Sequence, residues 1–434
     1  MEPNKVTTTR RNFLKKAGVA TAAAGLSVNI ALGRSSRFEM NSETLKVGLV
    51  GCGGRGSGAA NQALNADPNV VLWAMADIFP DRMETSLKNL TEAHPDKVKV
   101  DEGRQFIGFD AYKKLLESGV DVVLLATPPA FRPDHLRACI DADKHVFCEK
   151  PMAVDAAGVR KVIKVIDAAE QKGLSLMSGF CWRYHEPKRE TFSRILDGSI
   201  GDIKAIYNTY NTGYLWEKPR QEEWSEMENK LRNWIYYNWL SGDHIAEQAI
   251  HSLDMMSWAL GDVTPKQVSG TGGRQRRIED KYGNVYDHFA LVYEYENGAK
   301  GFHFSRQQKD TDRAYHVEML GTKGHAVADC IRRKHEIYGT ETWKYRGQSN
   351  NMYQTEHDEL FAAIRKGEQI LDKYMANSTL LAIIGRMVAY TGKTITWEQA
   401  LNSEEVLGPN INQYSWEFDW PTAEVAKPGL TEFR

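Results

Sequence analysis

The sequence predicts an α/β fold in two parts: a parallel sheet packed with helices, followed by an α+β domain whose open sheet is mostly antiparallel. Three observations support this. A glycine-rich turn joins a short apolar run to a helix near residue 51. Apolar runs then alternate with helical segments up to residue 180. Past Gly201 the pattern changes to the residue-by-residue alternation of strands. A chain of 434 residues has room for two such domains.

The glycine-rich turn reads Gly51-x-Gly53-x-x-Gly56, with the apolar residues of 47–50 before it and a helix after it. Gly51 allows a tight turn out of the strand, Gly53 lets the backbone approach a pyrophosphate, and Gly56 lets the helix pack closely on the strand. The helix N-terminus then directs its N–H groups at phosphate. The turn therefore predicts a Rossmann-type dinucleotide site, whose expected contacts in the turn are Gly51, Gly53, Gly54, Arg55 and Gly56.

An acidic residue in the expected place indicates which dinucleotide binds. Asp77 ends the second apolar run, Val70 to Ala76, and lies 21 residues past Gly56. An acid at this point hydrogen-bonds a ribose 2′-hydroxyl and repels a 2′-phosphate. We therefore expect NAD rather than NADP.

Two later strands end in polar or proline-rich turns at the same predicted sheet edge. The strand 120–126 ends in Thr127-Pro128-Pro129, and the strand 145–148 ends in Glu149-Lys150-Pro151. Such residues sit beside the cofactor. A lysine there can donate a hydrogen bond to a substrate hydroxyl or exchange a proton if its pKa is lowered, although a Glu-Lys pair is also a common surface ion pair. The helices expected around these strands span 80–90, 111–118, 135–142 and 153–172.

The first residues resemble an export signal. Arg10 and Arg11 precede a weakly apolar stretch from Ala17 to Leu32, which is typical of a twin-arginine (Tat) signal and too short and polar for a stable membrane span. A disordered basic segment is the alternative. We expect a signal segment at 1–34, a linker at 35–43 and a periplasmic or otherwise exported protein. Without a pool of free NAD, the cofactor should stay tightly bound and each hydride should be returned within the same site.

The second domain begins with a helix expected over 181–196 and continues with strands expected at 203–211, 286–296, 301–307 and 315–320. Residues 207–239 carry nine aromatic side chains, against 10% aromatic residues in the whole chain. Aromatic faces stack on sugar rings, although most of these rings fit an ordinary core equally well. On a regular helix His244, Glu247 and His251 would share one face. That face could also hold a divalent metal, but we expect none.

Several of these motifs together resemble one family. Ala126-Thr127-Pro128, His135, and Lys144-His145-Val146-x-Cys148-Glu149-Lys150-Pro151 follow the glycine turn. Phe180-x-x-Arg183-Tyr184, Gly198-x-Ile200-Gly201-x-Ile203 and Glu247-x-x-x-His251-x-x-Asp254 come later. This combination is similar to the Gfo/Idh/MocA oxidoreductases and covers nearly all of the chain after residue 44. The resemblance implies an open sheet that mediates homo-oligomers, but it leaves the reaction open.

The resemblance also implies roles for single residues. His251 matches the histidine that exchanges a proton with the hydroxyl being oxidised, and Glu247 replaces an aspartate that contacts the sugar. A further family branch of NAD-dependent glycosidases has a motif that this chain lacks. The expected catalytic residues are Lys150, His251 and Glu247. Further expected cofactor contacts are Asp77, Thr127, Pro128, His135, Glu149 and Lys150. The expected substrate contacts are Arg183, Tyr184, Trp239, His244 and Glu247.

Composition excludes other classes of function. The net charge of −2 gives no nucleic-acid footprint, and five scattered cysteines give no disulfide framework. We therefore expect an exported, NAD-retaining oxidoreductase acting on a hydroxyl of a sugar, polyol or glycoside. The alternatives are an enzyme that couples transient oxidation to glycoside cleavage or epimerisation, and a non-catalytic sugar-binding protein. The expected domains are 44–180 for NAD, 181–375 for substrate and oligomerisation, and 376–434 for C-terminal helices and a tail that pack back on the NAD domain.

Overall fold

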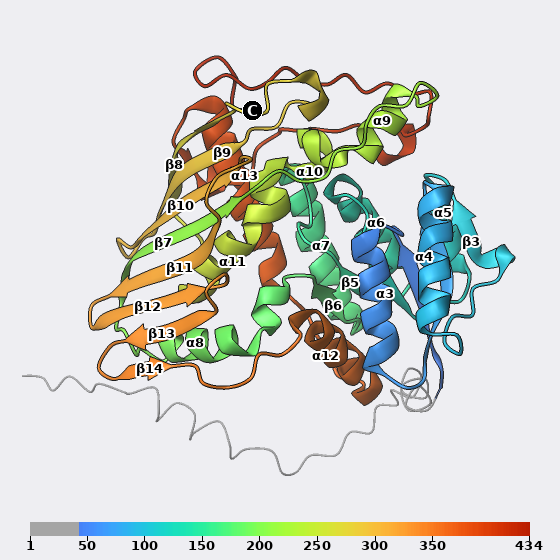
Figure 1. The fold of residues 1–434 in the computed structure, drawn as a ribbon, viewed down its shortest axis with the longest axis horizontal. Helices are drawn as coiled ribbons and strands as arrows, with labels where there is room; N and C mark the ends of the chain where they lie inside the picture. The colour runs from blue at the N-terminus through green and yellow to red at the C-terminus, as the bar shows by residue number, and fades with distance from the viewer. Residues whose placement is uncertain (1–42) are drawn as a thin grey trace, which may run out of the picture. The chain divides into compact units, whose positions relative to one another are not determined.

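The computed structural model describes residues 43–434, which form one compact unit (Figure 1). The expected signal segment, residues 1–34, and all but the last residue of the expected linker lie outside the described residues. Within the described part, no helix is both long enough and apolar enough to span a bilayer.

The first domain is a six-stranded parallel sheet with the strand order β3-β2-β1-β4-β5-β6, which confirms the predicted Rossmann-type fold. The strands are nearly continuous apolar runs because helices cover both faces. Their carboxyl ends meet at one edge, where the glycine turn, Asp77, Thr127 and Lys150 therefore converge. The strands are β1 (Leu45–Val50), β2 (Val70–Asp77), β3 (Gln105–Ile107), β4 (Val122–Leu125), β5 (His145–Cys148) and β6 (Leu176–Ser178). The helices are α3 (Gly54–Ala66), α4 (Pro80–Ala93), α5 (Ala111–Glu117), α6 (Arg132–Asp141) and α7 (Ala156–Lys172).

The helix expected over residues 181–196 is two elements, so that prediction was wrong. A 3-10 turn, Cys181–Tyr184, is followed by α8 (Glu186–Leu196), with extended backbone at His185 between them. Pro187 lies in the first turn of α8. A proline inside a helix has no N–H to bond to the preceding turn, and its ring clashes with the carbonyl four residues earlier, here that of Arg183, so one continuous helix cannot run through this point.

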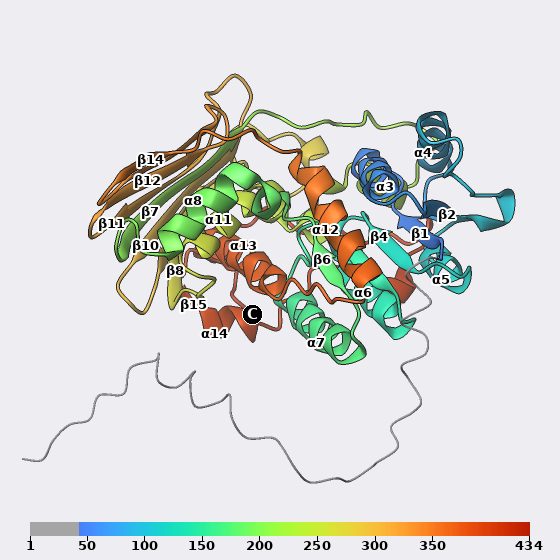
Figure 2. The same ribbon diagram turned by 90° about the horizontal axis from the view of Figure 1, so that it is seen from below.

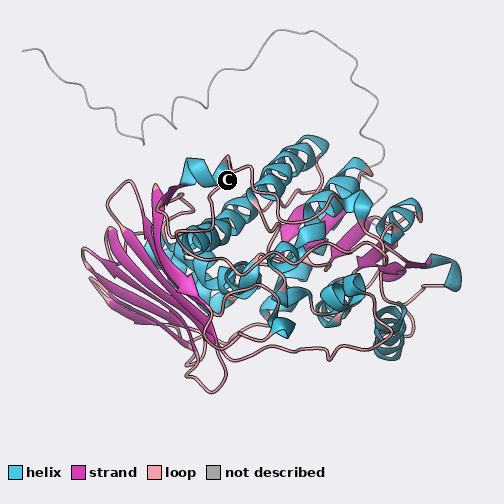
Figure 3. Cartoon of the chain, turned by 90° about the horizontal axis from the view of Figure 1, so that it is seen from above, coloured by secondary structure: helices cyan, strands magenta, loops and turns pink. Residues whose placement is uncertain are grey.

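The second sheet has nine strands in the order β14-β13-β12-β11-β7-β10-β9-β8-β15, and every neighbouring pair is antiparallel except β7 and β10. It stands beside the Rossmann domain with α8, α11 and α13 on one face, whereas no described element covers its other face (Figures 1, 2 and 3). The strands are β7 (Ile203–Thr212), β8 (Gln267–Gly273), β9 (His288–Glu294), β10 (Lys300–Gln307), β11 (Ala314–Gly321), β12 (Gly324–Asp329), β13 (Lys334–Tyr338), β14 (Thr342–Lys344) and β15 (Ile395–Thr396). The helices of this region are α9 (Glu226–Arg232), α10 (Asn238–Ser241), α11 (Ile250–Ala259), α12 (Met352–Lys366), α13 (Tyr374–Thr391) and α14 (Trp397–Leu401).

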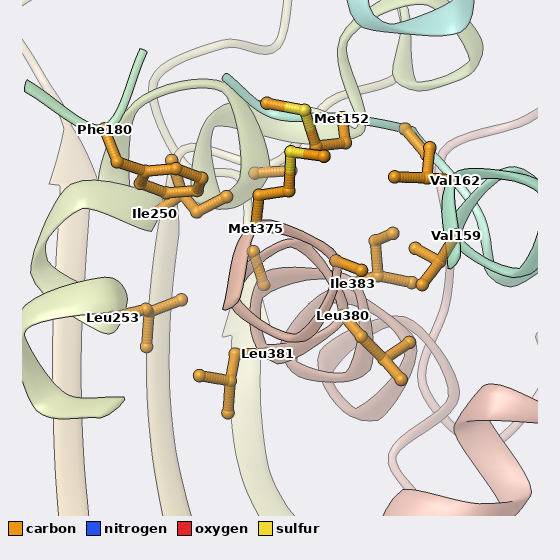
Figure 4. Packing of buried hydrophobic residues seen from close by; sticks show 14 of the residues in the cluster. Met152, Val159, Val162, Phe180, Ile250, Leu253, Met375, Leu380, Leu381 and Ile383 are labelled. Carbon is orange, nitrogen blue, oxygen red and sulfur yellow. The ribbon is translucent and has the colours of Figure 1, made fainter. Parts of the chain in front are cut away.

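Helix α13 joins the two domains into one core. Nearly all of its residues are buried, as expected for a helix that is apolar all round. In Figure 4 its Leu380 and Ile383 lie toward Val159 and Val162 of α7, and its Leu381 lies on the side of Leu253 in α11. Helix α12 packs on α3 beside the glycine turn. Both C-terminal helices therefore contact the NAD domain, and α13 also packs against the second sheet.

Candidate active site

A cavity of about 850 Å³ opens at the carboxyl edge of the Rossmann sheet. The glycine turn and the ends of β2 and β4 form one wall, and three side chains of the second domain, Trp216, Lys218 and Trp234, form part of the other. Glu247 also lines the cavity. The expected cofactor residues Gly51, Gly53, Gly54, Arg55, Gly56, Asp77, Thr127, Pro128 and His135 all face this space.

The glycine turn has the shape that a pyrophosphate requires. Gly51 has a φ of +94°, which favours glycine, and a Cβ on Gly56 would lie 1.9 Å from the Gly51 carbonyl oxygen. A Cβ on Gly53 or Gly54 would instead meet no protein atom within 4 Å. Gly53 is the N-cap of α3 and brings no side chain to the first N–H groups of that helix. The turn is thus an open cradle of backbone donors, and these residues fit the pyrophosphate of a dinucleotide.

Asp77 both faces the cavity and shapes the turn. Its Oδ2 accepts a hydrogen bond from the Cys52 N–H at 2.6 Å, and its Oδ1 accepts one from the Phe79 N–H at 2.8 Å. Burial raises the pKa of this carboxyl, while the two N–H donors and the nearby Arg82 oppose that rise. The carboxylate is therefore held in place before any ribose binds.

A buried arginine that sequence reasoning missed ties two strand ends together. Arg132 donates to the carbonyl oxygen of Thr127 at 2.8 Å and to that of Pro151 at 2.6 Å. His135 lies beside it, with Nδ1 3.3 Å from the Thr127 hydroxyl and its ring 4.1 Å from that of Tyr112. Burial, with Arg132 adding to the effect, lowers the pKa of His135 to about 3, so its imidazole is neutral.

Arg55, in the glycine turn, connects that turn to the strand end that carries Lys150. Its guanidinium donates to Glu149, to Glu356 at 3.0 Å and to Gln62 at 2.9 Å. Glu356 comes from α12, some 300 residues away in the chain, so no local pattern indicates its contact with Arg55. Burial raises the pKa of Glu356, whereas Arg55 and Lys150 outweigh burial and lower that of Glu149. Arg55 therefore pairs with the Glu149 carboxylate. This pair holds in place the residue that precedes Lys150.

The structure brings Lys150 and Glu247 together. The Lys150 ammonium donates to the backbone carbonyl of Glu247 and lies 3.8 Å from its carboxylate oxygen Oε1. Residues Ile245–Ala249 form a π-helical turn, whose wider spacing leaves the Glu247 carbonyl facing Lys150. The Lys150–Pro151 bond is cis.

His251 lies one turn beyond, within α11. Its ring stacks on that of Trp182, with ring centroids 5.0 Å apart. The Phe180 ring meets it edge-on, with ring centroids 6.4 Å apart. Nδ1 is buried and has no hydrogen-bond partner among the described residues. Burial, followed by the charges of Lys150, Lys188 and Arg55, lowers the pKa of His251 well below its usual value. His251 is therefore a neutral imidazole that can accept a proton.

The other expected substrate contacts are buried or paired within the protein, and their role stays a prediction. The π-helical turn breaks the expected common face: His244 is buried with Nδ1 3.3 Å from the Tyr286 carbonyl oxygen. Arg183 is held by Asp254 at 2.8 Å and by Asp262 at 2.6 Å. Tyr184, whose hydroxyl is 3.4 Å from an Asp372 oxygen, and Trp239, 1% exposed, are core residues.

Most aromatic rings of residues 207–239 form a cover for the cavity. Trp216 and Trp234 line it, while Tyr236, Tyr237 and Trp239 pack behind them with the tail ring of Tyr414. Arg232 fastens the cover to α4. Its guanidinium donates a hydrogen bond to each carboxylate oxygen of Asp81, at 3.1 and 3.2 Å. Five of the nine rings thus belong to the cavity and its cover, whereas Tyr207 is 40% exposed on the second sheet.

Three fully buried histidines predict acid lability. Burial lowers the pKa values of His135, His303 and His357 to about 3 each, whereas an unfolded histidine titrates near 6.5. Below pH 6.5 the unfolded chain therefore binds more protons, and each histidine costs about 1.4 kcal/mol of unfolding free energy per pH unit. Urea unfolding at pH 7 and pH 5.5 measures this loss. The His357 ring lies 4.3 Å from that of Phe147, centroid to centroid. His357→Phe should therefore lower the slope of unfolding free energy against pH by one histidine's share. An unchanged slope would mean that His357 does not contribute to the acid lability.

Comparisons with known proteins identify the family of both domains. Residues 45–180 match the family described as "Oxidoreductase family, NAD-binding Rossmann fold", and residues 190–327 match the "GFO/IDH/MocA C-terminal domain". Inositol 2-dehydrogenase of Rhizobium meliloti (strain 1021) is 25% identical over 337 residues, which are 75% of this chain and 91% of the relative.

Two solved structures share the fold. Levoglucosan dehydrogenase in complex with NADH and levoglucosan has a TM-score of 0.65 at 19% identity and covers 81% of this chain and 99% of its own. Aldose-aldose oxidoreductase from Caulobacter crescentus, complexed with glycerol, has a TM-score of 0.65 at 20% identity. The match covers 82% of this chain and 100% of that protein. The two family matches together span more than half of the sequence, and the chain therefore belongs to the Gfo/Idh/MocA family of NAD-dependent oxidoreductases.

Proposed function

We propose that this protein oxidises or reduces one hydroxyl-bearing carbon of a sugar, polyol or glycoside with NAD. The observation that carries the proposal is the meeting of Lys150, Glu247 and a neutral His251 near the end of a cavity built for a dinucleotide. A relative that is an inositol 2-dehydrogenase supports a polyhydroxylated substrate.

Each residue has a distinct role in this proposal. The bound nicotinamide supplies the hydride acceptor or donor. His251 accepts the hydroxyl proton during oxidation, because its imidazole is already neutral. Lys150 donates a hydrogen bond to the reacting oxygen and stabilises negative charge there, as an oriented ammonium does in a site shielded from water. Glu247 orients Lys150 and accepts hydrogen bonds from neighbouring hydroxyls of the substrate.

The test uses the purified protein and a panel of inositols, aldoses and glycosides. The proposal expects absorbance of bound NADH near 340 nm to appear on adding at least one member of the panel. Protein that contains NAD and reduces it with no member would contradict the proposal. Net cleavage of a glycoside without net reduction would instead favour coupled elimination.

We also propose that the NAD is retained through turnover. The cover, whose rings run from Trp216 to Trp239, supports this, since Arg232 fastens it across the cavity to Asp81 and also lies 4.1 Å from the Phe79 ring centroid. NAD should co-purify and survive dialysis. Arg232→Met should speed NAD dissociation several-fold, whereas Arg137→Met, which breaks the exposed pair with Asp141, should not. Equal release from both variants would contradict a fastened cover.

Export by the Tat pathway is the proposal for localisation, based on Arg10 and Arg11. Replacing both with lysine should trap the precursor in the cytoplasm, because the Tat pathway reads the arginine pair. Cell fractionation with an antibody against the chain measures this. Normal export of the double variant would mean that the twin-arginine interpretation is wrong.

A homo-oligomer through the uncovered face of the nine-stranded sheet is our proposal for assembly. Tyr207, Phe304 and Leu320 expose 40%, 38% and 51% of their surface there. Exposed apolar side chains in the middle of a sheet favour a protein interface. Analytical ultracentrifugation of wild type and Phe304→Glu tests this, and a monomeric wild type would exclude it.

A further inference from the structure

Lys188 is a buried cation close to His251, and the proposed mechanism does not use it. It lies on α8, is 3% exposed, and has no carboxylate within ion-pair distance among the described residues. Burying an ammonium group without a carboxylate is costly, so its retention at this position calls for a physical reason.

The contacts of Lys188 are all with neutral groups. Its Nζ lies 3.2 Å from Nδ1 of His185 and 5.1 Å from the ring centroid of Trp182, and it also contacts the Cys330 thiol. A lysine can only donate, so Nδ1 of His185 accepts, and Nε2 donates to Ser349 at 2.7 Å. These partners solvate the ammonium but form no ion pair with it.

Trp182 connects this cation to the site. The same indole ring that lies against Lys188 stacks on the His251 imidazole, with centroids 5.0 Å apart and planes 29° apart. A cation next to an aromatic ring is attracted by it, which fixes both groups relative to the histidine.

The cations near His251 differ in whether a carboxylate pairs with them. Three cations act on it: Lys150, Lys188 and Arg55. Lys150 is paired with Glu247, and Arg55 with the Glu149 carboxylate, while Asp254 on the histidine's own helix is engaged by Arg183. Lys188 alone among the three cations has no ion-pair partner among the described residues, and the Asp329 carboxylate acts on its neighbours Cys330 and His335.

We propose that Lys188 is a positioning residue that acts through Trp182 to hold His251 neutral and in place for accepting the substrate proton. The role in proton transfer rests on the proposed function, whereas the effect on the protonation of His251 does not. A like charge near a histidine disfavours the protonated ring, so removing that charge should raise the His251 midpoint.

The experiment compares wild type with Lys188→Met, which keeps the length without the charge, and Lys188→Arg, which keeps the charge. Histidine NMR of the full NAD-bound chain from pH 4 to pH 8 follows the His251 ring, assigned with His251→Gln. Lys188→Met should raise the midpoint by about one pH unit, and Lys188→Arg should leave it unchanged. Lys188→Gln is the second neutral variant if the methionine variant does not fold.

Cys330→Ser is the matched control, because it changes a neighbour of Lys188 without removing the charge. A His251 midpoint unchanged in both neutral variants, or shifted equally in Lys188→Arg, would overturn the proposal. In single turnovers the acid limb should move with the NMR midpoint. If the NMR shift is present but no substrate reduces the bound NAD, the effect on His251 stands and the proposed oxidoreductase activity fails.

Discussion

His251→Ala is expected to slow the reduction of bound NAD by about a hundredfold or more, which is what loss of a positioned proton acceptor costs. Cofactor binding should survive, because the cavity is lined by the glycine turn and Asp77 and does not include His251. Lys150→Ala should cause a loss of the same order, because the ammonium that polarises the reacting oxygen is removed.

The measurement is single-turnover reduction of bound NAD at saturating substrate, followed against pH. Burial, with Lys150, Lys188 and Arg55 adding to the effect, lowers the pKa of His251, so the neutral, active form should persist below pH 6.5 in the wild type. The rate should therefore be lost only on further acidification. His325→Ala, at an exposed position of strand β12, is the control and should leave the rate unchanged. A His251→Ala protein with the wild-type rate and pH profile would remove this residue from the mechanism.

Local signals explain why the cofactor half of the site was predictable. A turn that needs glycine, an acid at a strand end and a Glu-Lys-Pro segment are each written in a few adjacent residues. The parallel sheet then brings their strand ends to one edge. Asp77 shows the limit even here: its hydrogen bonds to the Cys52 and Phe79 N–H groups were not visible in the pattern.

The substrate half depended on geometry that spacing does not specify. A regular helix would align His244 with His251, but the π-helical turn rotates them apart and presents Glu247 to Lys150 instead. Arg132 and Glu356 contribute through contacts across the fold, and nothing in their local sequence distinguishes them from surface charges. The aromatic stretch was visible as a composition, but its role as a cover depends on the pairing of Arg232 with Asp81.

Gly56→Ala is expected to weaken NAD binding by about ten- to a hundredfold, since forcing a methyl group into a packed site typically costs 1–3 kcal/mol. The Cβ would lie 1.9 Å from the Gly51 carbonyl oxygen and 3.2 Å from the Ala126 Cβ. Because the closest contact is backbone, no rotamer change relieves it. Helix α3 must move away from β1, and the N–H groups that face the pyrophosphate move with it.

Two neighbouring glycines separate this effect from a general intolerance of the turn. Gly53→Ala meets no protein atom within 4 Å, so the apoprotein should keep its stability, and any lost affinity comes from a methyl group pressed against the pyrophosphate. Gly54→Ala has the same open space and, lying beside the close-approach position, should bind NAD nearly as well as the wild type. Gly56→Ala should lose both affinity and melting temperature. Calorimetric titration of NAD into stripped protein, with thermal unfolding of the same samples, measures both quantities. Equal affinities for the Gly56 and Gly54 variants would mean that the close approach of α3 to β1 does not set the cofactor site.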